Sequence, residues 1–278
     1  MKVPDHSVFR QMKRGVGAGM SGWRGDFLLA MKKPIRQAME LELPVSSVVK
    51  RFIVHVIGGD RCVHVEDLLG GLRLIPLDKN PGVRPIGCGE PLLKLVRGAW
   101  HRYLAPAIPK AFLPFQFACS LPAGIEALGR DILLEHEEAT KVGHHQIFIK
   151  RDAKNFYNEL DRLAVVHVLK ATLDPYFAQY IARVLGVPTV YTLFDAGAIA
   201  DPSSEQGLLE LSTVSGVVQG DVLGFLIGCA VAADAARAWS VTLKSAFPHL
   251  RAAFLSVGGK PGRCASSRKT PGDGHSRV

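Results

Sequence analysis

Two short apolar runs flank a turn signal in the first third of the chain. The runs are Leu72–Leu77 and Val83–Ile86, and the turn between them reads Asp-Lys-Asn-Pro-Gly. Strand-forming residues on both sides of such a turn predict a β-hairpin. Two later runs, 187–195 and 208–216, enclose a loop rich in Gly, Pro and Ser and predict a second pair of strands.

Other segments carry apolar residues at helical spacing. These segments are 35–43, 90–108, 123–140 and 158–186. Pro175 interrupts the last of them, so one or two helices are expected there, closed by Gly186. Interleaved helices and strands predict an α+β fold in which helices pack on a small antiparallel sheet.

The most apolar stretch of the chain runs from Val222 to Ala233 and follows Asp221. Asp is a favoured residue at a helix N-cap, so a helix is expected to begin here. The stretch is soon interrupted by Asp234 and Arg237, and it is too short to span a bilayer. The sequence therefore predicts a buried helix and no membrane partner.

Composition and charge narrow the class of protein. The 278 residues are 47% hydrophobic and 21% charged, which excludes a disordered polymer and a small disulfide scaffold. The net charge of +9 favours polyanions such as nucleic acid. Residues 251–278 contain six basic residues and one acid and so carry +5 of this charge. Three regions are expected: a basic, Gly-rich segment 1–33, a folded part 34–250 and a disordered basic tail 251–278.

The cysteines and the first residues of the chain indicate whether the protein is intracellular or secreted. Five cysteines without a CxxC pair favour a reduced, intracellular protein. The first residues lack the apolar core of a signal peptide, so secretion is not expected. The sequence leaves the nucleus and the cytoplasm open, and it leaves the oligomeric state open.

Three places could carry chemistry. The apolar run 145–152 predicts a strand that ends at Asp152, whose carboxylate could hold a divalent cation beside the aromatic rings of Phe156 and Tyr157. The alternative is that Asp152 caps the next helix. Lys79 and Arg84, at the end of the hairpin, could bind triphosphate oxygens or could be solvated surface residues.

The third place is the segment Ser215–Gly224, which reads SGVVQGDVLG. Its glycines allow a backbone to approach a ligand closely, and Gln219 could hydrogen-bond a base or a sugar. The alternative is an ordinary helix entry capped by Asp221.

Taken in order, these segments resemble the reverse transcriptases of non-LTR retrotransposons. GAGMSGW (17–23) is similar to a stretch that precedes the fingers, and LIPLDKNPGVRPIGCGE (74–90) is similar to the fingers motif. LPFQFACSLPAGIEAL (113–128) resembles a further family stretch, with Ala118 or Cys119 where glycine is expected. RDAKNFYNELDR (151–162) resembles palm motif A, and SGVVQGDVLG resembles motif B. The resemblance covers residues 15–245 and implies a partial right-hand polymerase fold with fingers and an incomplete palm.

The resemblance also implies roles for single residues. Asp152 would be a catalytic ligand of Mg²⁺, and Tyr157 would crowd a ribose 2′-hydroxyl. Lys79 and Arg84 would contact the incoming triphosphate, while Gln219 and Gly220 would lie against the nucleotide and the template. The implied reaction is attack of a DNA primer 3′-hydroxyl on a dNTP, directed by an RNA template and assisted by two Mg²⁺ ions.

The chain departs from the family at several positions. Phe156 replaces a small residue, and Val222 replaces proline. The family's Y-x-D-D motif is absent after Gly220, where the only aspartates are Asp221, Asp234 and Asp273. We therefore expect a truncated or frameshifted domain that is inactive alone, because Asp152 cannot hold two Mg²⁺ ions by itself.

Three alternatives remain open from the sequence. The chain could be a non-catalytic nucleic-acid-binding fragment, for which binding would be sensitive to salt. It could be an active enzyme that obtains its missing carboxylates from another chain. It could also be an unfolded pseudogene product with exposed apolar surface.

Overall fold

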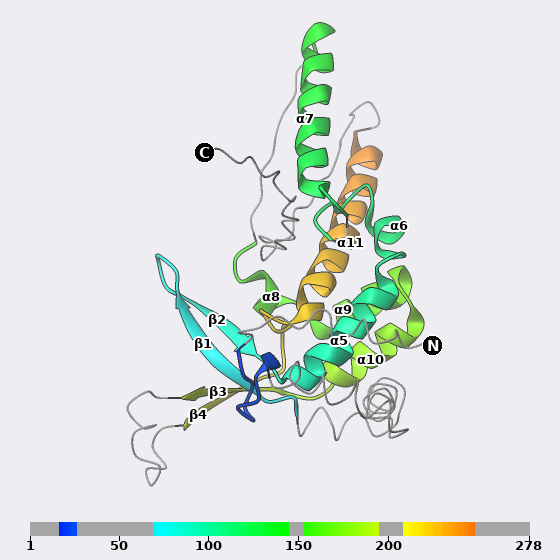
Figure 1. Cartoon of the computed structure of the whole chain (residues 1–278). Coiled ribbons are helices and arrows are strands. Elements are labelled where there is room, and N and C mark those ends of the chain that lie inside the picture. Colours follow the sequence, from blue (N-terminus) through cyan, green and yellow to red (C-terminus); the bar gives the residue numbers. More distant parts are fainter. Residues whose placement is uncertain (1–16, 27–68, 120, 145–152, 195–207, 248–278) are drawn as a thin grey trace, which may run out of the picture.

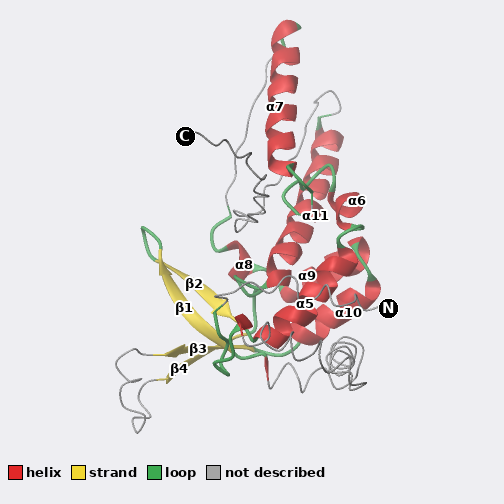
Figure 2. Ribbon diagram, viewed as in Figure 1, coloured by secondary structure: helices red, strands yellow, loops and turns green. Residues whose placement is uncertain are grey.

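The computed structural model describes residues 17–26, 69–119, 121–144, 153–194 and 208–247 (Figure 1). Several predictions lie outside these residues. They are the helix at 35–43, the strand at 145–152 with Asp152 at its end, and the basic tail 251–278. The described part is a mixed α+β structure with a small sheet beside a group of helices (Figure 2).

The sheet contains four strands in the order β2-β1-β3-β4. Their bounds are β1 Leu72–Asp78, β2 Val83–Cys88, β3 Thr189–Phe194 and β4 Leu208–Thr213. The β1–β2 and β3–β4 pairs are antiparallel, which confirms both predicted strand pairs.

The prediction that the whole sheet is antiparallel is wrong. Strands β1 and β3 pair in parallel, with Leu72 opposite Tyr191 and Arg73 opposite Thr192. Parallel neighbours need a crossover connection, and here the chain passes through a series of helices before it returns to β1. The sheet is therefore mixed: β1–β2 and β3–β4 are antiparallel pairs, and the parallel contact between β1 and β3 joins them.

Seven helices lie in the described part of the chain. Their bounds are α5 Pro91–Leu104, α6 Ile108–Phe112, α7 Gly124–Lys141, α8 Phe156–Glu159, α9 Arg162–Thr172, α10 Pro175–Leu185 and α11 Val222–Ala246. Helices predicted over 90–108 and 123–140 are confirmed, although the first ends at Leu104 and a separate helix, α6, begins at Ile108. The expected break at Pro175 separates α9 from α10, because Asp174 caps α10 by accepting hydrogen bonds from the amides of Tyr176 and Phe177.

Helix α11 forms the centre of the helical part. It contacts α5, α6, α8 and α9, and its buried face includes Leu226, Ile227 and Ala230. Next to it, the Trp100 ring lies 5.2 Å from the ring of Phe177 and 5.6 Å from that of Tyr180. These contacts join α5, α10 and α11 into one apolar core.

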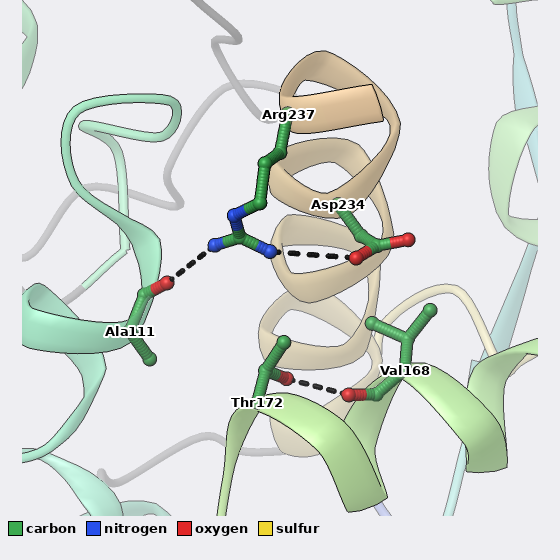
Figure 3. Close-up of polar contacts among 5 residues, drawn as sticks. All are labelled: Ala111, Val168, Thr172, Asp234 and Arg237. Carbon is green, nitrogen blue, oxygen red and sulfur yellow. Dashed lines mark hydrogen bonds and ion pairs between the residues drawn. The ribbon is translucent and has the colours of Figure 1, made fainter. Parts of the chain in front are cut away.

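Arg237 attaches the second half of α11 to the segment that contains α6. Its Nη2 donates to the carbonyl oxygen of Ala111 at 3.0 Å, and its Nη1 lies 3.4 Å from Asp234 Oδ1 (Figure 3). The guanidinium also lies over the ring of Phe115, 5.5 Å from its centroid. In the same view, Thr172 donates to the carbonyl of Val168 within α9. One side chain therefore fixes α11 against α6 through a polar and an aromatic contact.

Helix α11 extends well beyond the apolar stretch 222–233 on which its prediction rested. Its 25 residues make it long and apolar enough to cross a membrane by length and composition alone. The core helix of a globular domain passes the same test, and the first half of α11 is buried inside the molecule as predicted. Its length is therefore only weak evidence for a membrane.

Candidate nucleic-acid interface

The loop 215–221, which leads into α11, lies against the segment that follows Asp152 in the chain. The amide of Val217 donates to the carbonyl of Tyr157 at 2.8 Å, and the amide of Gly216 donates to that of Leu160 at 2.9 Å. Gly216 has φ +72, and a Cβ atom there would lie 2.6 Å from the carbonyl oxygen of Asn158. Glycine is therefore required at this position both by backbone conformation and by space.

The same loop also touches the base of the β1–β2 hairpin. The amide of Gly87 donates to the carbonyl of Gln219 at 3.0 Å. Gly220 has φ +103, and a Cβ atom there would lie 3.1 Å from Ile86 Cγ2 and 3.2 Å from the Gly87 carbonyl oxygen. We call the loop 215–221, together with Ile86–Gly87 and 157–160, the junction. It brings together three segments that are distant in the sequence.

Asp221 stabilises the start of α11 at the junction. Its Oδ1 accepts from the amide of Leu223 at 2.7 Å and caps α11, as predicted, and its Oδ2 pairs with Arg97 from α5. Both side chains are only 8% exposed. Since a buried pair is broken only at high cost, this carboxylate is not available as a metal ligand.

The two hairpin residues predicted to bind phosphate, Lys79 and Arg84, lie away from the junction. Lys79 is in the turn, where its amide donates to the carbonyl of Gly82 at 2.9 Å, and Arg84 is opposite Leu77 on β2. Both side chains are exposed, and the hairpin projects from the sheet (Figure 1). At about 3.3 Å per residue, Arg84 lies roughly 10 Å along the strand from Gly87, and Lys79 lies farther out. The structure therefore joins Gln219 and Gly220 to the base of the hairpin, while Lys79 and Arg84 occupy its outer half.

Tyr157 lies beside α11. Its ring is 5.5 Å from that of Phe156, and a Cβ atom on Gly228 of α11 would lie 3.0 Å from both rings. Burial raises the pKa of the Tyr157 hydroxyl, and the nearby thiols of Cys229 and Cys119 raise it further. Both rings that the sequence placed beside Asp152 thus pack on a glycine of the central helix.

Asp152 itself lies outside the described residues, so its predicted role is not tested by the structure. Within the described ranges, no group of three His, Cys, Asp or Glu side chains could hold a metal ion. Because Asp221 is already paired with Arg97, the described residues do not provide a donor set for Mg²⁺.

Arg162 stabilises the loop 215–221 and was missed by the sequence analysis. Its Nε donates to the carbonyl of Gly216 at 3.1 Å, and its Nη1 donates to the carbonyls of Leu185 and Val187 at 3.0 and 2.8 Å. Its Nη2 donates to Thr189 Oγ1 at 2.8 Å. Burial lowers the pKa of this guanidinium. No local pattern signals such a role, because the acceptors are mostly backbone carbonyls brought together by the fold.

A second missed contact fixes the N-terminal segment. Glu90, which is 5% exposed and precedes α5, accepts hydrogen bonds from the amide and the hydroxyl of Ser21 at 2.7 and 2.6 Å. Lys94 Nζ donates to the carbonyl of Gly17 at 3.4 Å. Burial lowers the pKa of Lys94, although Cys88, Asp221 and Glu90 oppose this effect. The SGW stretch is therefore attached to the end of the hairpin segment, close to the junction.

Comparison with known proteins identifies no family. No protein-family model matches the chain, and no curated protein is similar to it.

Proposed function

We propose that this chain is a reverse-transcriptase-like domain that binds a primer–template duplex through the junction and the β1–β2 hairpin. It would consist of the fingers and part of the palm of a right-hand polymerase. One observation carries the proposal: the loop 215–221 is hydrogen-bonded both to the segment after Asp152 and to the base of the hairpin. These three segments are the ones whose sequences resemble motif B, motif A and the fingers motif.

The hairpin has the properties of a phosphate-binding element. Lys79 and Arg84 are exposed on a projection whose end also carries exposed Asp78, which lies opposite Val83. Arg offers a bidentate fork to phosphate oxygens, and Lys offers a point charge. At the base, the exposed Gly220 has no side chain and presents backbone to a passing strand. A duplex that lies along the hairpin could contact Lys79 and Arg84 at the tip and the backbone of Gly220 at the base.

The proposal is one of binding rather than of catalysis by this sequence alone. Nucleotidyl transfer with two Mg²⁺ ions needs several carboxylates near one another. After Gly220 the sequence has no adjacent pair of aspartates, and Asp221 is paired with Arg97. Any bound Mg²⁺ would rely on Asp152 and on carboxylates that these residues do not supply.

Fluorescence anisotropy with a labelled DNA primer on an RNA template tests the proposal. In the double variant Lys79→Ala/Arg84→Ala, we expect weaker binding, and the slope of log K against log salt should fall by about 1–2 because up to two phosphate contacts are lost. Arg130→Ala/Lys141→Ala is the matched control, since it removes the same charge from exposed positions on α7. Equal losses in the two variants would show that binding depends on net charge and not on the hairpin.

A further inference from the structure

A cavity of about 490 Å³ lies between the sheet, α10 and the start of α11. Sites for small molecules commonly have volumes of about 300–1,000 Å³. Most of the wall is apolar and includes Tyr180, Ile181, Leu223 and Ile227. None of the proposed nucleotide-binding side chains, Lys79, Arg84, Tyr157 and Gln219, lines it. The cavity therefore excludes these four side chains, although it shares Val217, Val218 and Asp221 with the loop 215–221 of the proposed interface.

Thr192 places an unpartnered polar group at this cavity. The residue is 2% exposed and lines the cavity from β3, and its hydroxyl has no hydrogen-bond partner among the described residues. Because Thr192 lines the cavity, its hydroxyl is available to form a hydrogen bond with a ligand atom there.

Glu210 supplies the charge of the site. It lies directly opposite Thr192 in the β3–β4 register, lines the cavity and is exposed at its edge. It forms no ion pair with any residue in the described ranges. The other charged lining residues, Arg97 and Asp221, are paired with each other. The cavity is thus apolar inside, with a hydroxyl in its wall and a carboxylate at its rim.

We propose that this cavity binds a small amphipathic amine. The apolar body of the ligand lies among Ile181, Leu223 and Ile227. Its ammonium group lies at the rim beside Glu210 and donates a hydrogen bond to the hydroxyl of Thr192. Since Val217 and Val218 also line the cavity, the bound amine contacts the loop 215–221.

Three probes with one apolar body test the charge preference: 6-phenylhexylamine, 6-phenylhexan-1-ol and 6-phenylhexanoate. Isothermal titration calorimetry on the full chain should show that the amine binds at least about threefold more tightly than the alcohol, the gain typical of an exposed charge pair. The carboxylate should bind most weakly, because it faces Glu210. A carboxylate that binds as tightly as the amine would overturn the proposal.

Two variants locate the binding. Glu210→Gln should remove the preference for the amine over the alcohol, while Glu126→Gln, an exposed acid on α7, should preserve it. Val184→Phe adds volume inside the cavity and should abolish binding of all three probes. Unchanged binding to a folded Val184→Phe variant would contradict the assignment. If that variant does not fold, the Glu210→Gln result decides, since a preference kept there excludes this site.

Discussion

Gly216 shows how a single residue holds the junction together. Its left-handed backbone turns the loop, and the absence of a side chain lets the backbone of Tyr157 and Asn158 approach within hydrogen-bonding reach of the loop. A larger residue would separate the motif-B-like loop from the segment after Asp152. The two motif resemblances therefore meet at a point where the structure permits only glycine.

Gly216→Ala should destabilise the fold by more than the backbone strain alone. An alanine in the left-handed region costs about 1–2 kcal/mol, and the Cβ would additionally meet the Asn158 backbone at 2.6 Å. We expect a loss of about 3 kcal/mol or more in the free energy of unfolding, measured by urea denaturation.

Gly143→Ala is the matched control for this prediction. Gly143 has the same φ of +72, but a Cβ atom there meets nothing within 4 Å. It should therefore lose only the backbone term of about 1–2 kcal/mol. Equal losses at the two glycines would mean that the contact between the loop and the Asn158 backbone is absent in solution.

At the scale of elements, α11 depends on the way it begins. Asp221 caps its first turn and at the same time neutralises Arg97, so one carboxylate fixes the central helix against α5. The first turn of α11 also follows directly on the loop 215–221. The start of the core helix and the shape of the junction are therefore stabilised by the same residue.

Asp221→Ala should be strongly destabilising. It removes the cap and leaves Arg97 without its buried carboxylate, a change that typically costs about 3–5 kcal/mol. Asp161→Ala is the comparison, because Asp161 caps α9 by accepting from the Ala164 amide at 2.7 Å and its contact is exposed. It should lose only about 1 kcal/mol. Thermal or urea unfolding of both variants measures the difference, and a similar loss in each would argue against the Arg97 pair.

The sequence predicts the local elements better than their pairing. Both hairpins and the caps at Asp174 and Asp221 follow from patterns a few residues long, and the structure contains them. The parallel pairing of Leu72 with Tyr191 joins distant segments, and the sequence of neither strand indicates which strand it pairs with. Arg162 was missed for the same reason, because its acceptors are gathered by the fold. The short helix α8 follows a left-handed Asn155, a conformation that its sequence does not signal.

Only part of the candidate site could be predicted from the sequence. Contacts of Gln219 and Gly220 with the hairpin base could not be predicted from spacing, since they depend on the crossover between β1 and β3. The exposure of Lys79 and Arg84 could be predicted, because a polar turn between strands projects into solvent. The role of Asp152 remains a prediction from resemblance.

In the whole molecule, the positive charge favours binding of nucleic acid, while the missing carboxylates argue against polymerisation. The net charge of +9 favours association with nucleic acid, while the second acidic pair of a polymerase is absent from the sequence. The two features together predict binding of a primer–template without extension.

A primer-extension assay with an RNA template, dNTPs and Mg²⁺ examines this directly. We expect no extension by the purified chain, since the loss of even about 4 kcal/mol of transition-state stabilisation lowers a rate about a thousandfold. Asp152→Ala should behave like the wild type. Extension that disappears in the Asp152→Ala variant would show that the chain assembles a complete metal site.

We propose that the hairpin and the loop 215–221 form one interface for nucleic acid. Hydrogen–deuterium exchange of the full chain, with and without the primer–template, tests whether the two segments bind it together. We predict that amides in 79–87 and 215–221 become protected together when the duplex binds, while amides of α7 do not change. Protection confined to α7, or protection of the hairpin without the loop, would show that the two segments do not form one interface.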